Sequence, residues 1–211
     1  MANSNVSFGL KPIGILGAAP YSSGVTEYRI ASDNSNPIFQ GMAVIPLAAG
    51  VIDDLQAAAG GNVGIAGVFN GCEYVSSTTG EKIFSNYWPG SGADSNFPVK
   101  AFLYDNPNQL FTICTSNVVS AANTEAEIRA AVFANIAFAT GNSGSTTTGI
   151  STATADLNTI ATTNTLALRI MGVQDDPENS DFTAAGIPLI VRINNHFNAP
   201  TGSIAAATVS T

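Results

Sequence analysis

Short apolar runs separated by turn-forming residues fill the stretch 63–105, and this alternation limits the folds open to the chain. Residues 63–74, 82–87 and 99–104 are rich in β-branched and aromatic side chains, which is typical of strands. Gly, Pro, Asn and Ser gather between these runs, as turns require. The pattern predicts a β-meander whose aromatic side chains belong to a binding surface rather than to a reaction centre.

More strands are expected on both sides of this meander. Their predicted ranges are 26–30, 38–47, 110–114, 166–173 and 187–193. A glycine within the second range, Gly41, favours a bulge or a sharp bend of the kind that small barrels use. The sequence therefore predicts a mainly β fold, a compact β-barrel or β-tulip-like domain with one short helix and extended termini.

Two segments carry helical signals. Residues 53–59 begin with two acids, which favour the start of a helix, and end at a glycine pair. Residues 123–137 offer Thr124 as a cap and apolar side chains at a four-residue step. A strand over 132–138 competes with the second helix, so both interpretations stay open there.

The chain has 211 residues, a length that fits one large domain or two small ones. We expect an N-terminal arm over residues 1–24, a β-rich domain over 25–198 and a flexible C-terminal tail over 199–211. If the domain is built from two similar β modules, they span about 25–118 and 119–198.

An internal similarity raises the question of two modules. The sequence IAGV at 65–68 leads to FPV at 97–99, and IMGV at 170–173 leads to IPL at 187–189. Either a duplication or chance accounts for it, because short apolar strands resemble one another. Between the two copies, residues 140–165 are nearly all Ser, Thr, Asn, Gly and Ala, which predicts either a long loop or weakly packed strands.

Charge excludes some partners. Charged residues make up 10% of the chain and the formal net charge is −8. The seven basic residues are scattered singly, so the chain lacks the basic surface that releases counterions from nucleic acid. No apolar run reaches the roughly 18 residues that span a bilayer, and no signal peptide is evident at the amino terminus. We expect neither a nucleic-acid nor a membrane partner, and synthesis in a cytoplasm.

Residues able to carry chemistry are few and isolated. Cys72 and Cys114 fit two buried thiols, with a disulfide as the alternative. The single histidine, His196, follows the last expected strand and is read as structural or exposed rather than catalytic. We predict no catalytic residue and no cofactor.

An acidic cluster near the end of the chain is the one candidate for a metal site. It comprises Asp175, Asp176 and Glu178, with Asp181 beyond. Calcium needs several oxygen ligands converging from a loop, but this cluster lacks the spacing and the glycine of an EF-hand. We interpret it as a solvated turn and predict no metal site.

The loop that holds Tyr87, Trp88 and Pro89 contains the only tryptophan of the chain. A tryptophan between Tyr and Pro-Gly suits an anchor that a neighbouring subunit buries. It equally suits a lid over the core of its own domain. These three residues are the candidate interface site.

Four stretches resemble virion structural proteins of tailed phages, notably marine ones. They read GVFNGCEYVSSTTGEKIFSNYWPGS with FPVKAFLYDNPNQLFTI, then LRIMGVQDDPEN, then PLIVRINNHF. Within that group the chain looks like a capsid decoration, or cement, protein. The resemblance covers roughly residues 63–197 and rests on phrases rather than on a catalytic signature.

This resemblance implies a non-enzymatic protein that binds the outer surface of an icosahedral phage head and stabilises the shell. The implied partners are the major capsid protein and copies of the chain itself, commonly as a homotrimer, and the implied location is the virion exterior. Another virion component, a head fibre or tail protein, is the first alternative. A carbohydrate-active or proteolytic enzyme using dispersed carboxylates is the second.

Overall fold

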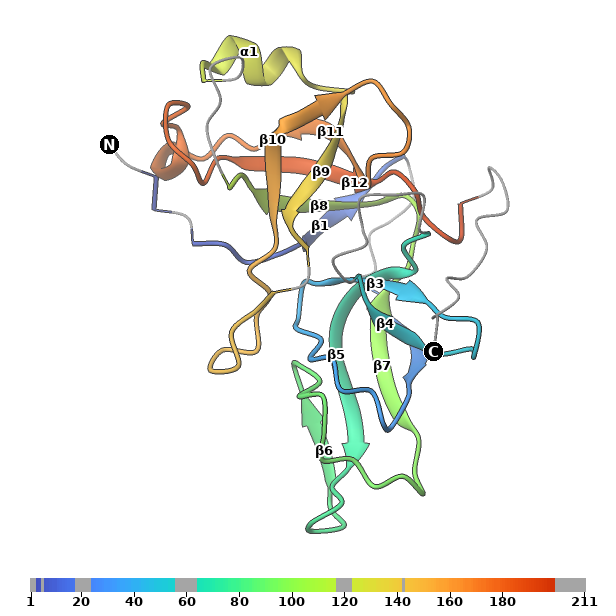
Figure 1. Ribbon diagram of the computed structural model, residues 1–211. Helices are drawn as coiled ribbons and strands as arrows, with labels where there is room; N and C mark the ends of the chain where they lie inside the picture. The colour runs from blue at the N-terminus through green and yellow to red at the C-terminus, as the bar shows by residue number, and fades with distance from the viewer. Residues whose placement is uncertain are drawn as a thin grey trace.

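The computed structural model describes residues 3–4, 6–17, 24–55, 64–116, 123–141 and 143–199. Strands make up 46% of it, and one short helix accompanies them (Figure 1). The elements are β1 (Lys11–Ile15), β2 (Thr26–Ile30), β3 (Ala43–Pro46), β4 (Ile52–Asp54), β5 (Gly67–Val75), β6 (Lys82–Ser85), β7 (Val99–Tyr104), β8 (Gln109–Cys114), α1 (Glu125–Ala130), β9 (Asn135–Thr140), β10 (Thr154–Ala161), β11 (Leu168–Val173), a 3-10 turn (Pro177–Asn179) and β12 (Pro188–Ile193). The mainly β fold is confirmed.

Five strands close into a barrel, which we call barrel 1. Around the ring they run β2, β7, β5, β3 and β4, and β4 returns to β2 through a parallel pairing of Ile30 with Ile52. The other four pairings are antiparallel. Strand β6 pairs with β5 outside the ring. The predicted β-barrel is therefore present, and the meander predicted over 63–105 supplies two of its strands.

A second ring, barrel 2, uses β8, β12, β11, β9 and β10. It closes through a parallel bridge between Thr115 and Ala155, where the Ser116 N–H donates to the Ala155 carbonyl at 3.0 Å. The strands of each ring can be numbered from one to five in chain order. Neighbouring strands around each ring then follow the order one, five, four, two, three. In both rings the pair of first and third strands is parallel and all others are antiparallel.

The internal similarity of the sequence falls on equivalent strands of the two rings. Residues 65–68 lead into β5 and residues 170–173 lie in β11, the fourth strand of each ring. Residues 97–99 enter β7 and residues 187–189 enter β12, the fifth strand of each ring. The two rings divide in the turn 105–108, ahead of the boundary expected near residue 118, because β8 pairs with β12.

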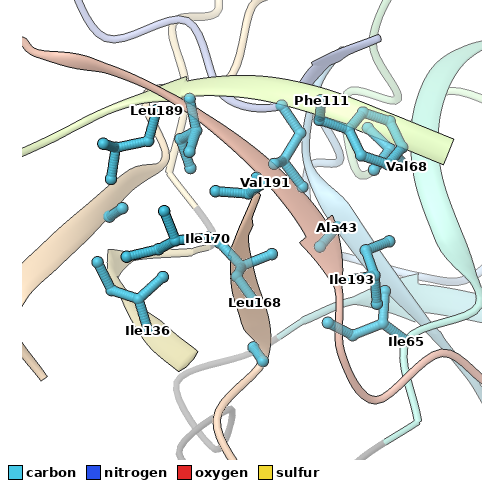
Figure 2. Packing of buried hydrophobic residues seen from close by; sticks show 14 of the residues in the cluster. Ala43, Ile65, Val68, Phe111, Ile136, Leu168, Ile170, Leu189, Val191 and Ile193 are labelled. Atoms are coloured by element: carbon cyan, nitrogen blue, oxygen red, sulfur yellow. The ribbon is translucent and has the colours of Figure 1, made fainter. Parts of the chain in front are cut away.

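Strand β3 of barrel 1 is buried on both faces, which explains its nearly continuous apolar sequence. Met42 and Val44 belong to the core of barrel 1, whereas Ala43 and Ile45 belong to the core shared with barrel 2. Figure 2 shows Ala43, with Val68 of β5, close to β12 side chains such as Ile193. The two barrels therefore pack against each other through an apolar contact.

The loop between β9 and β10 also joins the barrels. The Gln40 N–H donates to the Gly149 carbonyl at 3.0 Å, and the Ser151 N–H donates to the Gln40 carbonyl at 2.8 Å. The Asn86 side-chain amide donates to the Thr148 carbonyl at 2.8 Å. The composition of the tract 140–165 predicts either a long loop or weakly packed strands. The structure contains both, a loop against barrel 1 followed by strand β10.

The helix predicted over 123–137 is too long. Helix α1 covers only Glu125–Ala130, and β9 takes the residues from Asn135 onward, as the competing strand interpretation held. The capping prediction is confirmed: Thr124 and Glu127 form a reciprocal capping box. The helix ends early because the residues from Asn135 onward pair with β11 and β10.

Two other predictions need correction. Asp53 and Asp54, expected to start a helix, end strand β4, while residues 56–63 lie outside the described residues. The N-terminal arm is extended but also packed, because its residues Lys11–Ile15 form β1 and pair antiparallel with β8. The tail prediction for 199–211 lies outside the described residues except at Ala199.

Candidate functional site

Trp88 lies in the core of barrel 1. Its exposed fraction is 0%, and its ring meets the Tyr74 ring edge-on at 5.4 Å between centroids. Its backbone pairs with Ile38, and its indole Nε1–H donates to the Asn34 carbonyl at 3.2 Å. Of the two alternatives for this residue, the lid over its own core is therefore correct, and Trp88 is not an interface anchor.

The turn 33–37 holds the Trp88 loop in place. Asp53 is nearly buried and accepts hydrogen bonds from the side-chain amides of Asn34 at 2.8 Å and Asn36 at 3.1 Å. Gly90 has φ of 80°, and a Cβ there would lie 2.6 Å from the Ser35 carbonyl. These contacts fix the loop on the barrel, so it is a structural cap rather than a free surface.

Tyr87 and Pro89 flank the buried indole and are half-buried. The Tyr87 ring stacks on Phe39 with 5.7 Å between centroids and 8° between planes. Both residues keep part of their surface in solvent, so their interface role stays a prediction.

His196 is a buried structural residue. Its exposed fraction is 2%, and it pairs with Ile65 in a parallel bridge at the junction of the barrels. Its Nδ1 accepts a hydrogen bond from the Asn198 N–H at 3.1 Å. Burial lowers the pKa of His196 to about 4, so the ring is neutral at physiological pH.

Both cysteines are free and buried, which confirms the two-thiol prediction over the disulfide alternative. Burial raises the pKa of Cys72 to about 12 and raises that of Cys114. Neither side chain is a thiolate near neutral pH, and thiolates are the reactive form. The two thiols act as small core residues.

The acidic cluster forms a hydrogen-bonded turn. Asp175 pairs with Arg129 at 2.7 Å, and Asp176 caps the 3-10 turn through the Glu178 N–H at 3.1 Å. Asp181 accepts from the N–H and the hydroxyl of Thr183. No group of three or more potential metal ligands converges among the described residues.

A groove of about 770 Å³ lies between the barrels and the N-terminal arm. Two neutral pairs line it: Gln40 Nε2 donates to Asn70 Oδ1 at 3.1 Å, and the Thr112 hydroxyl donates to Gln174 Oε1 at 2.9 Å. Apolar side chains such as Ile13 and Ile150 form part of its wall. Sequence analysis missed this groove because its residues come from distant segments brought together by the fold.

Three phenylalanines expose most or half of their side-chain surface. The exposed fractions are 70% for Phe84 on β6, 50% for Phe97 and 73% for Phe133 between α1 and β9. Large exposed rings are the side chains that association buries to greatest effect. Phe84 lies two residues after Lys82 on β6, and both are exposed, whereas Ile83 and Ser85 are half-buried.

Comparison with protein-family models, curated proteins and solved structures found no match to this chain. Among the described residues, no helix has the length and apolar character needed to cross a bilayer.

Proposed function

We propose that this chain is a non-enzymatic capsid decoration protein, which binds the outer surface of an icosahedral phage head and stabilises the shell. The observation that carries the proposal is the set of exposed rings at Phe84, Phe97 and Phe133 on a body of two joined barrels. Apolar rings left in solvent gain free energy when a partner covers them.

The buried polar residues support the same proposal. Asp53 binds two asparagine amides, His196 is neutral and buried, and both cysteines lie in the cores. In the described part of the chain, these side chains, which could carry chemistry, therefore have structural roles. The exposed phenylalanines have no comparable role within the chain.

A decoration protein stabilises a shell by mass action. When it binds the expanded shell more tightly than the unexpanded one, each bound copy shifts the equilibrium toward the expanded state. The partners in this proposal are the major capsid protein and other copies of the chain, a homotrimer being the assembly that the phage resemblance implies. The proposed location is the virion exterior.

The test mixes the purified chain with expanded and unexpanded heads of the phage that encodes it. We expect saturable binding to expanded heads, at hundreds of copies per particle, and a rise in the temperature at which those heads break. Absence of binding to both kinds of head would refute the proposal. A few copies per particle, confined to the tail, would instead support a tail protein.

A further inference from the structure

Two of the seven basic residues, which are scattered singly in the sequence, meet in the fold. Arg169 of β11 lies directly opposite Arg192 of β12, and these neighbouring strands are antiparallel (Figure 1). Residues directly opposite share one face of a sheet and have Cβ atoms roughly 5 Å apart. Because Leu168 and Ile170 belong to the core, both arginines lie on the outer face of barrel 2. We call these two residues the arginine pair.

The residues that flank the arginine pair in the sheet are uncharged. Asn135 of β9 lies opposite Arg169 on its other side, and Leu110 of β8 lies opposite Arg192. In the described part of the chain, neither arginine forms an ion pair with a carboxylate. Like charges directly opposite one another destabilise a sheet, so this arrangement costs stability until an anion offsets it.

Barrel 1 contains a similar basic pair with a different environment. Arg29 of β2 lies directly opposite Lys100 of β7. Glu73 of β5 lies opposite Lys100 on the other side, and Glu27 binds Lys100 Nζ at 3.0 Å. Two acids therefore lie beside this pair. The arginine pair has no such neighbours among the described residues, although the chain as a whole carries a net charge of −8.

Hydrogen bonds hold one guanidinium group and leave the other unsatisfied. Arg169 Nε donates to Asn135 Oδ1 at 3.1 Å, and the buried Asn135 amide donates to the Thr163 carbonyl at 2.7 Å. Arg192 Nε is buried and has no hydrogen-bond partner among the described residues. The Arg192 charge is thus partly withdrawn from water without compensation, and a nearby anion would stabilise it.

One acid in this region is engaged elsewhere. Asp105 and Arg192 both act on the pKa of His196, which Asp105 raises and Arg192 lowers. The two carboxylate oxygens of Asp105 accept hydrogen bonds from the hydroxyls of Thr26 and Tyr28, each at 2.9 Å. His196 is neutral at physiological pH, so it supplies no charge to the site. Asp105 is therefore bound to barrel 1 and leaves the guanidinium groups open to a ligand.

We propose that the arginine pair binds a tetrahedral oxyanion, a phosphate or sulfate group, on the outer face of barrel 2. A guanidinium group is a planar fork that donates to two oxygens of such a group. Two forks together suit four oxygens, whereas a carboxylate has two. A free phosphate or sulfate ion has four oxygens, and an ester of either keeps three of them unbridged. The site does not depend on shell binding and stands or falls separately from the decoration function.

The test is titration calorimetry of the purified full chain with sodium phosphate and with sodium sulfate, at an ionic strength held constant with chloride. We expect saturable binding of one anion per chain, and a rise in Tm of about 3–6 °C at ten times the Kd. Sodium acetate should bind at least tenfold more weakly. Absence of saturable binding by both phosphate and sulfate overturns the proposal, as does acetate binding of equal affinity.

Substitutions of the two arginines locate the site. Arg192→Gln should weaken phosphate binding at least tenfold without lowering the Tm measured in the absence of phosphate, since it also removes the repulsion within the pair. Arg169→Lys keeps the charge but loses the planar fork, so it should weaken binding by a smaller factor. Unaltered phosphate affinity in Arg192→Gln overturns the proposal.

Arg29→Gln is the matched control, because it removes a basic residue from the pair beside which two acids lie. It should leave phosphate affinity unchanged. Equal losses of affinity in Arg29→Gln and Arg192→Gln overturn the proposal, because phosphate would then respond to net charge alone. Titration with glucose 6-phosphate distinguishes the sources of the oxyanion. Binding tighter than that of inorganic phosphate assigns the site to an ester on a larger molecule, and weaker binding assigns it to the free ion.

Discussion

The two barrels share a strand order but differ in what fills and caps them. Barrel 1 has an aromatic core that includes Phe39, Phe69 and Trp88. The core around barrel 2 is largely aliphatic, with Phe111 as its one fully buried ring in the described part of the chain. An asparagine-rich turn and an indole cap the first ring, whereas Ile128 of helix α1 is buried over the second.

This difference shows that the ring order does not depend on the identity of the core residues. The backbone ladders and the alternation of apolar positions are common to both rings, while the side chains that fill them differ. Cores accept extensive apolar exchange when volume and pattern are kept. The sequence similarity between the rings is accordingly confined to a few apolar positions on their fourth and fifth strands.

Removing the two caps gives the largest expected effects. Trp88→Ala should lower the free energy of unfolding by about 3–5 kcal/mol, because it empties a large buried volume and leaves polar groups unpaired. Ile128→Ala, the counterpart in barrel 2, should cost less, about 2–3 kcal/mol. Urea unfolding followed by circular dichroism measures both, since the first variant lacks the chain's one tryptophan.

A Trp88→Ala variant that is as stable as the wild-type chain would break the comparison, because the cap of barrel 1 would then have no structural role. Equal losses for the two variants would show instead that the aromatic and aliphatic caps contribute alike.

Acid should weaken the junction between the barrels through His196. Its folded-state pKa of about 4 lies below the ordinary value of 6.5, so the unfolded chain gains a proton first as pH falls. The contribution is fully present above pH 6.5 and is lost between pH 6.5 and about 4, amounting to about 3 kcal/mol. Urea unfolding at a series of pH values measures this slope.

His196→Asn is the control for the pH series, because its side-chain oxygen can still accept from the Asn198 N–H. The variant should show a shallower dependence on pH over the same window. An identical slope in variant and wild type would assign the acid sensitivity to carboxylates instead.

Asp53→Asn tests the asparagine clamp that is special to barrel 1. The new amide turns an NH₂ group toward one of the donors from Asn34 or Asn36, so a buried bond is lost and about 2 kcal/mol of stability with it. Asp33→Asn changes an exposed acid of the same turn and should stay within about 0.5 kcal/mol of the wild type. Equal effects of the two changes would count against the clamp.

The smallest effect is expected at the helix that caps barrel 2. Thr124→Ala removes one half of the capping box and should cost about 1 kcal/mol, while Thr124→Ser should retain most of the stability. Thermal unfolding of the two variants makes the measurement. A serine variant as unstable as the alanine variant would show that the hydroxyl is not what matters.

The strands were predictable because their signal is local. The range 26–30 coincides with β2, and the expected strands around 99–104, 110–114 and 187–193 match β7, β8 and β12 within a residue. The capping box at Thr124 is likewise a local pattern. Local signals failed where tertiary pairing competed with them, as at β4, whose two acids suggested a helix start.

The surface features needed the assembled fold. Trp88 is held in the core because its indole donates a hydrogen bond to the turn 33–37, which is distant in the sequence. No residue pattern predicted the turn conformation that exposes Phe133. The strand order that the two rings share is evident only from the strand pairing. Sequence similarity between the barrels indicated that equivalence without defining it.

The measurement that tests the decoration proposal most directly is a cryo-electron microscopy reconstruction of purified virions. We predict two-barrel bodies that match this structure on the outside of the head, at hundreds of copies per particle and arranged by the lattice of the major capsid protein. Heads without such bodies, or a chain found only at the tail, would contradict the proposal.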